Sequence, residues 1–352
     1  MTAMPEKKLN ILHVVRRYGP VGGMERYVWE VTRELRDLGH QVEVLCEVCL
    51  ADKPEGIVVH ELGTIAPRPR WLALLRFGNR VANWLKTNPH GDFLIHSHER
   101  LSSHHITTFH GPPFATIFER SWWRLISLRV AMQLFLEKRE LVRAQYIVPN
   151  SEFIKKQLSH YYPEITIKLT TPIVPGVVSG KIRNATTVPS DGGTIGFVGK
   201  EWKRKGLPFA VNIIKELRCH RPHLKFRVVG PAIPDIKHLF SDEKNDQLLG
   251  WSEAAHYAEF DVLLHPAKAE PYGMVISEAM AACVPVVISD VCGAAPQVLP
   301  EAGTVLSLDA GVDVWVDAVE QQLSRRSPAP QFVRSWREVA QDYEQVYYSV
   351  NL

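Results

Sequence analysis

Two glutamates with seven residues between them, Glu270 and Glu278, form the clearest chemical pattern in this chain. A helix is predicted to begin at Gly273, which lies between them and lets the backbone come close to a ligand. The first amides of that helix, at Met274 and Val275, have no acceptor within the helix and therefore favour a phosphate.

The same spacing predicts a role for each carboxylate. Glu278 follows Met274 by one helical turn, so it could accept hydrogen bonds from a ribose attached to that phosphate. Glu270 could bind sugar hydroxyls on the other side. The pattern predicts a nucleotide-sugar site, and the alternative is an ordinary helix start with one acid near its positive end.

A second candidate loop lies at 200–206, between a predicted strand at 194–199 and a predicted helix at 207–217. It holds four cations beside a glycine, among them Lys200 and Lys205. Such a loop would offset the charge of a diphosphate through charge-assisted hydrogen bonds. The alternative is a basic surface loop.

The first half of the chain begins with a predicted strand at 11–15, a loop, and a predicted helix at 24–38. Gly22 and Gly23 lie in that loop, at the carboxyl end of the strand, where open α/β sheets bind ligands. The loop lacks the G-x-G-x-x-G pattern, so a nicotinamide cofactor is not indicated. The alternative for this pair is a tight turn that needs a positive φ.

Two histidines follow the ends of two further predicted strands, His98 after 94–97 and His110 after 106–109. The carboxyl ends of parallel strands face one crevice, so this arrangement is typical of a site. A lone histidine is more often structural, and the pattern does not support a metal.

The glutamate pattern resembles the E-x7-E signature of retaining family-4 glycosyltransferases of the GT-B architecture. The Gly-Met-Val insert and the small residues at 278–282 match that signature. The resemblance implies that Glu270 contacts the donor sugar, that Glu278 binds the ribose, and that the amides between them hold the distal phosphate.

Other segments are similar to the same family. His110, within Thr-Phe-His-Gly, resembles its donor-contacting histidine. His98 is a further candidate, facing the acceptor. Gly22-Gly23 resembles its diglycine loop. Lys200 and Lys205 resemble its basic pair at the diphosphate, although Arg is commoner at the first position. Trp251 would lie beside the nucleotide base or in the core.

The resemblance implies an α/β protein with the GT-B fold, in which two Rossmann-like domains face a central cleft. A chain of 352 residues has room for two domains. We expect an acceptor-binding domain at 1–175 and a nucleotide-sugar-binding domain at 176–330, with a polar linker near 172–192. A C-terminal helix at 331–352 is expected to cross back to the first domain.

Composition narrows the class of protein. A net charge of only +3 argues against a nucleic-acid binder. Five cysteines form no disulfide framework, and the C-x-x-C at 46–49 has no second pair to complete a zinc site. No apolar run has the roughly 18–20 residues that span a bilayer, and the first ten residues have no signal-peptide core. We therefore expect a cytoplasmic protein, or one peripheral at the inner face of the cytoplasmic membrane.

Two stretches mix basic residues with tryptophan, at 64–90 and 120–124. Such a mixture favours docking on an anionic membrane surface or binding of a lipid-linked acceptor. The alternative is the solvated face of a core helix.

The expected activity is the retaining transfer of a hexose from a nucleotide diphosphate sugar, most simply a UDP sugar, to a hydroxyl of a glycan or lipid-linked acceptor. Lipopolysaccharide core is the acceptor that the resemblance implies. The chain has no Asp-x-Asp pair, so metal-independent stabilisation of the leaving diphosphate is expected, with no cofactor beyond the donor. Three alternatives stay open: a sugar-nucleotide epimerase, a glycoside hydrolase, and a non-catalytic nucleotide-sugar-binding protein.

Overall fold

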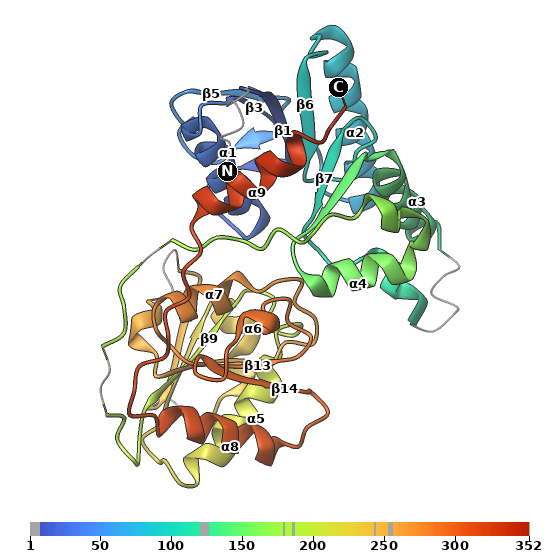
Figure 1. The fold of residues 1–352 in the computed structure, drawn as a ribbon. Coiled ribbons are helices and arrows are strands. Elements are labelled where there is room, and N and C mark those ends of the chain that lie inside the picture. Colours follow the sequence, from blue (N-terminus) through green and yellow to red (C-terminus); the bar gives the residue numbers. More distant parts are fainter. Residues whose placement is uncertain are drawn as a thin grey trace. The chain divides into compact units, whose positions relative to one another are not determined.

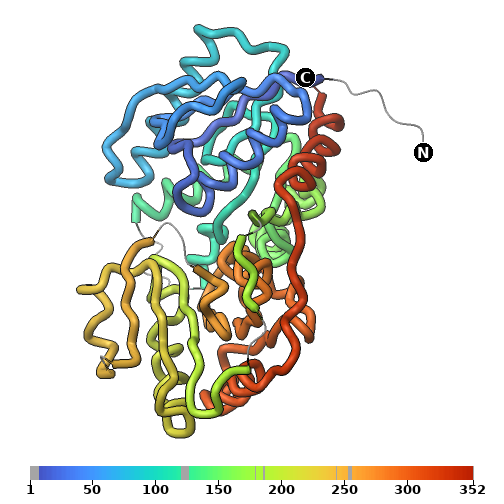
Figure 2. The backbone as a smooth tube through the Cα atoms, turned by 90° about the vertical axis from the view of Figure 1, so that its left-hand side faces the viewer, coloured from blue at the N-terminus to red at the C-terminus, as the bar shows by residue number. Residues whose placement is uncertain are grey.

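The computed structural model describes residues 8–119, 127–178, 180–184, 187–242, 244–252 and 256–351. Contacts divide the chain into two compact units. Unit 1 comprises Met1–Gly176 and Ser335–Leu352, and unit 2 comprises Val177–Arg334. The chain therefore leaves unit 1 once and returns to it for its last helix (Figures 1 and 2).

Unit 1 is built on a six-stranded parallel sheet in the order β5-β3-β1-β6-β7-β8. Its strands are β1 (Asn10–Val14), β3 (Gln41–Cys46), β5 (Ile57–Glu61), β6 (Phe93–Ser97), β7 (Ile106–Phe109) and β8 (Tyr146–Pro149), beside the separate pair β2 (Arg17–Tyr18) and β4 (Val48–Cys49). Its helices are α1 (Met24–Asp37), α2 (Arg70–Thr87), α3 (Leu128–Arg143), α4 (Glu152–Tyr161) and α9 (Trp336–Tyr347), with the 3-10 helices η1 (Phe114–Glu119) and η3 (Pro163–Lys168).

Unit 2 repeats the plan with the parallel order β11-β10-β9-β12-β13-β14. Its strands are β9 (Thr194–Val198), β10 (Lys225–Val229), β11 (Asp246–Gly250), β12 (Val262–His265), β13 (Val286–Ser289) and β14 (Gly303–Leu306). Its helices are α5 (Leu207–Arg218), α6 (Ile233–Ile236), α7 (Met274–Ala281) and α8 (Val312–Leu323), with the 3-10 helices η4 (Lys237–Leu239), η5 (Tyr257–Glu259) and η6 (Ala295–Gln297).

Local sequence explains why these elements form where they do. The strands β1, β12 and β13 are almost wholly buried, as expected for parallel strands covered on both faces. Helix α4 begins at Ser151, whose hydroxyl accepts a hydrogen bond from the amide of Ile154 at 3.2 Å.

The C-terminal helix α9 begins with a capping box, in which Ser335 and Glu338 each bind the other's backbone amide. Its buried face includes Trp336 and Tyr343, and it packs against α1 of the same unit. The hydroxyls of Tyr27 on α1 and Tyr343 are 2.8 Å apart and hydrogen-bonded. The expected return of this helix to the N-terminal part of the chain is confirmed.

The expected architecture of two Rossmann-like α/β sheets is confirmed. The loop at 16–23 differs in detail, because its first residues form the short strand β2. The basic and aromatic stretch predicted at 120–124 lies outside the described residues. Among the helices that are described, none combines the length and apolar character required to cross a bilayer.

Candidate functional site

Three loops meet at the carboxyl edge of the unit 2 sheet, after β9, β12 and β13. The backbone ties them together: the amide of Lys268 donates to the carbonyl of Arg204 at 2.8 Å, and the amide of Gly293 donates to the carbonyl of Glu270 at 2.9 Å. These contacts bring the predicted basic loop beside the predicted glutamate, although 65 residues separate Lys205 from Glu270 along the chain.

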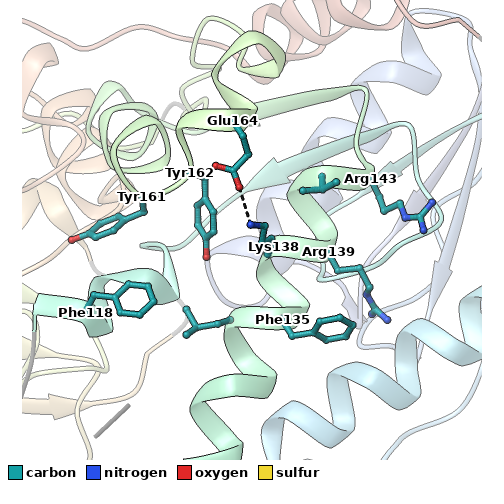
Figure 3. Close-up of a pocket in the computed structure, with 10 residues that line it drawn as sticks. Phe118, Phe135, Lys138, Arg139, Arg143, Tyr161, Tyr162 and Glu164 are labelled. Carbon is teal, nitrogen blue, oxygen red and sulfur yellow. Dashed lines mark ion pairs between the residues drawn. The ribbon is translucent and has the colours of Figure 1, made fainter. Parts of the chain in front are cut away.

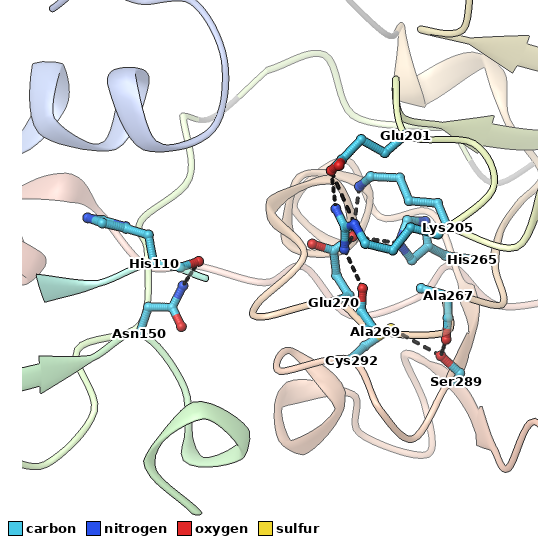
Figure 4. A network of polar contacts seen from close by, with 11 residues as sticks. His110, Asn150, Glu201, Lys205, His265, Ala267, Ala269, Glu270, Ser289 and Cys292 are labelled. Carbon is cyan, nitrogen blue, oxygen red and sulfur yellow. Dashed lines mark hydrogen bonds and ion pairs between the residues drawn. The ribbon is translucent and has the colours of Figure 1, made fainter. Parts of the chain in front are cut away.

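Glu270 is buried at the centre of this edge, surrounded by cations and an imidazole (Figure 4). Its Oε2 lies 2.8 Å from Lys205 Nζ, 3.5 Å from an Arg204 guanidinium nitrogen and 3.4 Å from His265 Nε2. Burial is the largest single effect and opposes ionisation of the carboxyl. Lys205, His265 and Arg204 together outweigh it, so the pKa of Glu270 lies well below its usual value. The site therefore holds a fixed carboxylate beside fixed positive charge.

Glycines make room for Lys205. Gly199 has φ +147°, and a Cβ there would lie 2.1 Å from Lys205 Cδ. Gly206 has φ +80°, and its Cβ would lie 1.9 Å from the carbonyl oxygen of Pro266. Both positions exclude a side chain, so the lysine stem passes through space that only glycine leaves open.

Lys200 takes a different place from Lys205. It follows Gly199 at the end of β9 and is exposed. Arg204, one of the four cations of the predicted basic loop, approaches Glu270 and also donates to the carbonyl of Ala269. His265 was missed by the sequence analysis, and burial lowers its pKa while the hydrogen bond to Glu270 raises it.

Helix α7 begins as the sequence predicts. Gly273 adopts the left-handed region with φ +98°, and a Cβ there would lie 3.1 Å from Glu270 Cγ. Among the described residues no side chain caps this helix, and its first residues, Met274 and Val275, are half-buried. The helix therefore offers amide groups at a partly accessible end.

Glu278 lies one turn into α7 and is half-buried. Its Oε2 accepts a hydrogen bond of 2.6 Å from the hydroxyl of Tyr257, which orients the carboxylate. Trp251 follows β11 and is 63% exposed, so the alternative that it belongs to the core is wrong.

In unit 1, His98 and His110 belong to a row of hydrogen-bonded imidazoles. His13 Nδ1 lies 3.0 Å from His98 Nε2, and His98 Nδ1 lies 2.9 Å from His110 Nε2. Burial lowers the pKa of His13 and of His110 to about 3, and it also lowers that of His98 well below the usual value. All three rings are therefore neutral, and His110, which is half-buried, ends the row.

A second chain of hydrogen bonds joins this region to α9. His96 Nδ1 lies 2.7 Å from the hydroxyl of Tyr347, and His96 Nε2 lies 2.8 Å from Thr108 Oγ1. Thr108 in turn lies 2.7 Å from the hydroxyl of Tyr343. The sequence analysis did not identify His13 or His96, although residues 96 and 98 alternate along one strand and so face the same side.

The glycine loop before α1 is exposed. Gly22 has φ +85°, and a Cβ there would lie 2.6 Å from Glu25 Oε2. Gly23 is the residue before the first turn of α1 and leaves open space where a Cβ would stand. A tight turn with positive φ therefore exists at Gly22, and it does not exclude a ligand beside Gly23.

A pocket of about 610 Å³ lies elsewhere in unit 1, beside α3 and α4 (Figure 3). Its lining is apolar and basic: Phe118, Leu134, Phe135, Lys138, Arg139, Val142, Arg143, Tyr161, Tyr162 and Glu164. None of these residues was assigned a role from the sequence. On α2, within the predicted basic stretch at 64–90, Arg80 donates to the carbonyls of Leu62 and Gly63 and so has a structural role.

Two family models match the chain, one in each half. The model described as Glycosyltransferase Family 4 matches residues 21–174, and the model described as Glycosyl transferases group 1 matches residues 192–325.

Curated relatives are similar over most of their length. The phosphatidyl-myo-inositol mannosyltransferase of Mycolicibacterium smegmatis is 27% identical over 294 residues, which are 76% of this chain and 72% of that protein. The D-inositol 3-phosphate glycosyltransferase of Corynebacterium urealyticum is 22% identical over 94% of this chain and 92% of that protein.

Solved structures are similar across nearly the whole chain. WaaG, a glycosyltransferase involved in lipopolysaccharide biosynthesis, superimposes with a TM-score of 0.77 at 18% identity and covers 95% of both chains. The Anabaena protein HepE in complex with UDP-glucose gives a TM-score of 0.70 at 17% identity, over 97% of this chain and 100% of that one. At such identities these likenesses concern the fold.

Proposed function

Because this chain belongs to family 4 of the glycosyltransferases, retaining enzymes that use nucleotide-sugar donors, and has their GT-B fold, we propose that it transfers a hexose from a UDP-linked donor to a hydroxyl of a lipid-linked glycan acceptor. The observation that carries the donor half of this proposal is the carboxyl edge of unit 2. There one amide-rich helix start lies between two oriented carboxylates, one of which is paired with a half-buried lysine.

Each part of this edge has a proposed role. Glu278 accepts hydrogen bonds from the ribose hydroxyls, and the amides of Gly273, Met274 and Val275 bind the distal phosphate. Glu270 binds hydroxyls of the hexose. Trp251, exposed at the end of β11, packs against the base.

The cations stabilise the charge that develops as the diphosphate departs. The stem of Lys205 lies against the backbone of Gly199 and its ammonium is fixed by Glu270, so its position changes little at the moment of reaction. It is paired with Glu270 at 2.8 Å, and a diphosphate beside it would compete for the same ammonium. Lys200, which is exposed, supplies a second positive charge. Enzymes of this family typically need no metal ion for this step.

Unit 1 contributes the acceptor side. His110 presents a neutral imidazole that contacts the donor sugar. His98, predicted to face the acceptor, is buried and hydrogen-bonded through both ring nitrogens, so its role is to orient His110. Gly22 and Gly23 let the backbone of the loop before α1 come close to the donor and acceptor. In a retaining reaction by front-face attack, the departing phosphate takes the acceptor proton, so none of these residues has to form a covalent bond with the sugar.

The identity of donor and acceptor rests on two supports. A similar fold is known in complex with UDP-glucose. WaaG takes part in lipopolysaccharide biosynthesis, and the mycobacterial relative is named for phosphatidyl-myo-inositol. Both point to an acceptor at a lipid surface, and we propose lipopolysaccharide core for this chain.

An exposed apolar stripe on α3 supports location at the inner face of the cytoplasmic membrane. Leu128, Phe135 and Val142 are seven residues apart on one helical face, and they are 70%, 53% and 45% exposed. Arg139 and Arg143 lie on the same helix beside the pocket. Apolar side chains flanked by cations suit an anionic membrane.

The activity is tested by incubating the protein with UDP-glucose, UDP-galactose and GDP-mannose and measuring nucleoside diphosphate release, with and without lipopolysaccharide-core acceptor. We expect release from a UDP sugar that depends on acceptor and needs no added metal. Conversion of the donor without acceptor would instead indicate an epimerase, and binding without release a non-catalytic protein.

Membrane docking is tested by sedimentation with neutral and anionic vesicles. We expect binding to vesicles containing phosphatidylglycerol, weakened several-fold by Phe135→Asp. Leu249→Asp is the matched control, because Leu249 is a similarly exposed apolar residue on unit 2. Equal binding to neutral vesicles would refute the electrostatic part of the proposal.

A further inference from the structure

A second group of chemically capable side chains lies in unit 1, and none of its carboxylate or imidazole members has a role in the donor or acceptor site proposed above. Glu43 on β3 and His60 on β5 lie on adjacent parallel strands, where Glu43 pairs with Val58 and His60 with Leu45. They therefore share one face of the sheet. His90, in the turn between α2 and β6, completes the group.

Both imidazoles aim the same nitrogen at the same oxygen. His60 Nε2 lies 2.7 Å from Glu43 Oε2, and His90 Nε2 lies 3.3 Å from it. The other carboxylate oxygen, Oε1, faces the side-chain amide of Gln41 at 3.4 Å. The ring of Trp84 packs against both imidazoles, with its centroid 4.8 Å from that of each ring.

The hydrogen bonds of His90 place the lone pair of its Nε2 opposite a second acceptor. Its Nδ1 lies 2.7 Å from the backbone carbonyl of Asn88, which only accepts, so Nδ1 carries the hydrogen. In the neutral ring Nε2 is then a lone pair, and it faces a carboxylate oxygen that also only accepts. A positive charge between the two atoms resolves this opposition, either as a proton on the ring or as a metal ion.

The distances suit a metal ion. Two ligand atoms about 2.0 Å from a tetrahedral Zn²⁺ lie about 3.3 Å apart, which is the separation between His90 Nε2 and Glu43 Oε2. His60 Nε2 would have to withdraw by roughly half an ångström. The Nδ1–H of His90 already donates to a carbonyl, the usual way in which a metal-bound imidazole is oriented.

We propose that Glu43, His60 and His90 form a binding site for a divalent transition-metal ion, with Zn²⁺ as the probe. Two imidazoles and one carboxylate are the ligand set that such ions prefer, with water completing the coordination. The His60 side chain is 31% exposed, so an ion reaches the site from solvent. A bound ion ties the edge strand β5 to β3 and to the turn before β6.

The row of histidines at His13, His96 and His98 offers a contrast. Those side chains are fully buried, and their ring nitrogens face imidazoles or hydroxyls, which can either donate or accept. No two groups that can only accept face each other there, so the ring nitrogens of that cluster can form hydrogen bonds without an ion.

The experiment is equilibrium dialysis of the untagged, EDTA-treated full chain against Zn²⁺, with bound metal measured by elemental analysis. We expect about one tightly bound Zn²⁺ per chain and a Kd at least about tenfold higher in Glu43→Gln and in His90→Gln. His223→Gln is the matched control, because His223 also lies beside a carboxylate, that of Asp191, on the surface of unit 2. Unchanged Zn²⁺ affinity in both site variants, or no tight binding by the wild type, would overturn the proposal.

A measurement on the wild type alone covers the case in which a variant does not fold. Co²⁺ bound by two imidazoles and a carboxylate gives visible absorption without a thiolate charge-transfer band. We expect that spectrum. A strong near-ultraviolet sulfur band would show that the ion is bound by cysteine and would refute the assignment to Glu43, His60 and His90.

Discussion

The carboxyl edges of the two sheets hold buried polar side chains in opposite ways. In unit 1, burial lowers the pKa of His13, His98 and His110 so far that the row is neutral. In unit 2, Glu270 is as buried but remains ionised, because Lys205 and its neighbours more than offset the cost of burial.

The two edges therefore differ in how their polar side chains respond to a change in charge or to a substitution. A neutral imidazole row can exchange its donor and acceptor roles without a net charge appearing in the interior. A buried ion pair instead keeps a fixed charge, and its members depend on each other, since removing one leaves the other uncompensated. We therefore expect substitutions in unit 2 to have larger effects than those in unit 1.

The largest effect is expected from Lys205→Ala. It removes the cation proposed to stabilise the leaving diphosphate, and loss of one such preorganised group lowers kcat by roughly 10²–10³-fold. It also leaves Glu270 without its nearest counter-charge, so the pKa of that carboxyl rises. The measurement is steady-state release of nucleoside diphosphate from the donor.

Lys203→Ala is the control for charge alone, because Lys203 is an exposed cation in the same loop that lies over the ring of Trp202. We expect it to change kcat less than about twofold, as for an exposed charge. Equal losses in Lys203→Ala and Lys205→Ala would show that the loop acts only through its net charge.

A smaller effect is expected from Glu278→Gln, which removes a charged acceptor for the ribose hydroxyls. Hydrogen bonds to a charged group contribute about 1.5–3 kcal/mol, so the Kd for UDP should rise by roughly 10–100-fold. Titration calorimetry with UDP measures this directly. Tyr257→Phe, which removes only the 2.6 Å bond that orients Glu278, should cost less. A normal Kd in Glu278→Gln would remove this residue from the donor site.

The sheets were predictable because a parallel strand covered on both faces is a nearly continuous apolar run. The short strand β2 was not, since two residues carry no periodicity. Strand order depends on distant pairs, such as Asn10 with Phe93, and no local pattern encodes it.

Individual candidate residues of the site could be predicted from the sequence, but the contacts between them could not. Glycines and a predicted helix start single out Glu270 and Lys205 as candidate ligand-binding residues. That the two pair with each other, and that His265 joins them, follows only from the packing of three loops. His13 was missed because a histidine inside an apolar strand has no sequence sign of its partner.

The next largest effect is expected on the stability of the two units when the pH is lowered. His13 is neutral in the folded chain, with a pKa of about 3, but takes up a proton near pH 6.5 when unfolded. The unfolded state therefore binds more protons between these values, and stability falls as pH falls through that window, by about 1.4 kcal/mol per pH unit for each such histidine. Glu270, whose pKa is lowered, keeps its contribution until pH falls below its usual value of 4.5.

Urea unfolding at pH 7 and pH 5.5, followed separately for each unit by hydrogen exchange, measures this difference. Unit 1 should weaken first, because its histidines of lowered pKa outnumber Glu99 and Glu140, whose raised pKa values act in the opposite direction. His265, whose pKa is also lowered, gives unit 2 a slope of the same sign. His13→Gln should reduce the pH dependence of unit 1, while His223→Gln, at an exposed position, should not. Parallel weakening of both units would contradict the comparison.

The smallest effect is expected from Tyr343→Phe, within the neutral network of unit 1. It removes a hydroxyl that lies 2.7 Å from Thr108 and 2.8 Å from Tyr27, both buried. Because Thr108 and Tyr27 can each rotate their hydroxyl toward another acceptor and no charge is exposed, we expect a loss of only about 1 kcal/mol in the free energy of unfolding. Tyr146→Phe, which removes one exposed bond to the carbonyl of Ser349, should cost less still. If Tyr343→Phe lowered the free energy of unfolding by as much as Lys205→Ala does, the members of the neutral network would depend on each other as strongly as those of the ion pair. The contrast between the two edges would then fail.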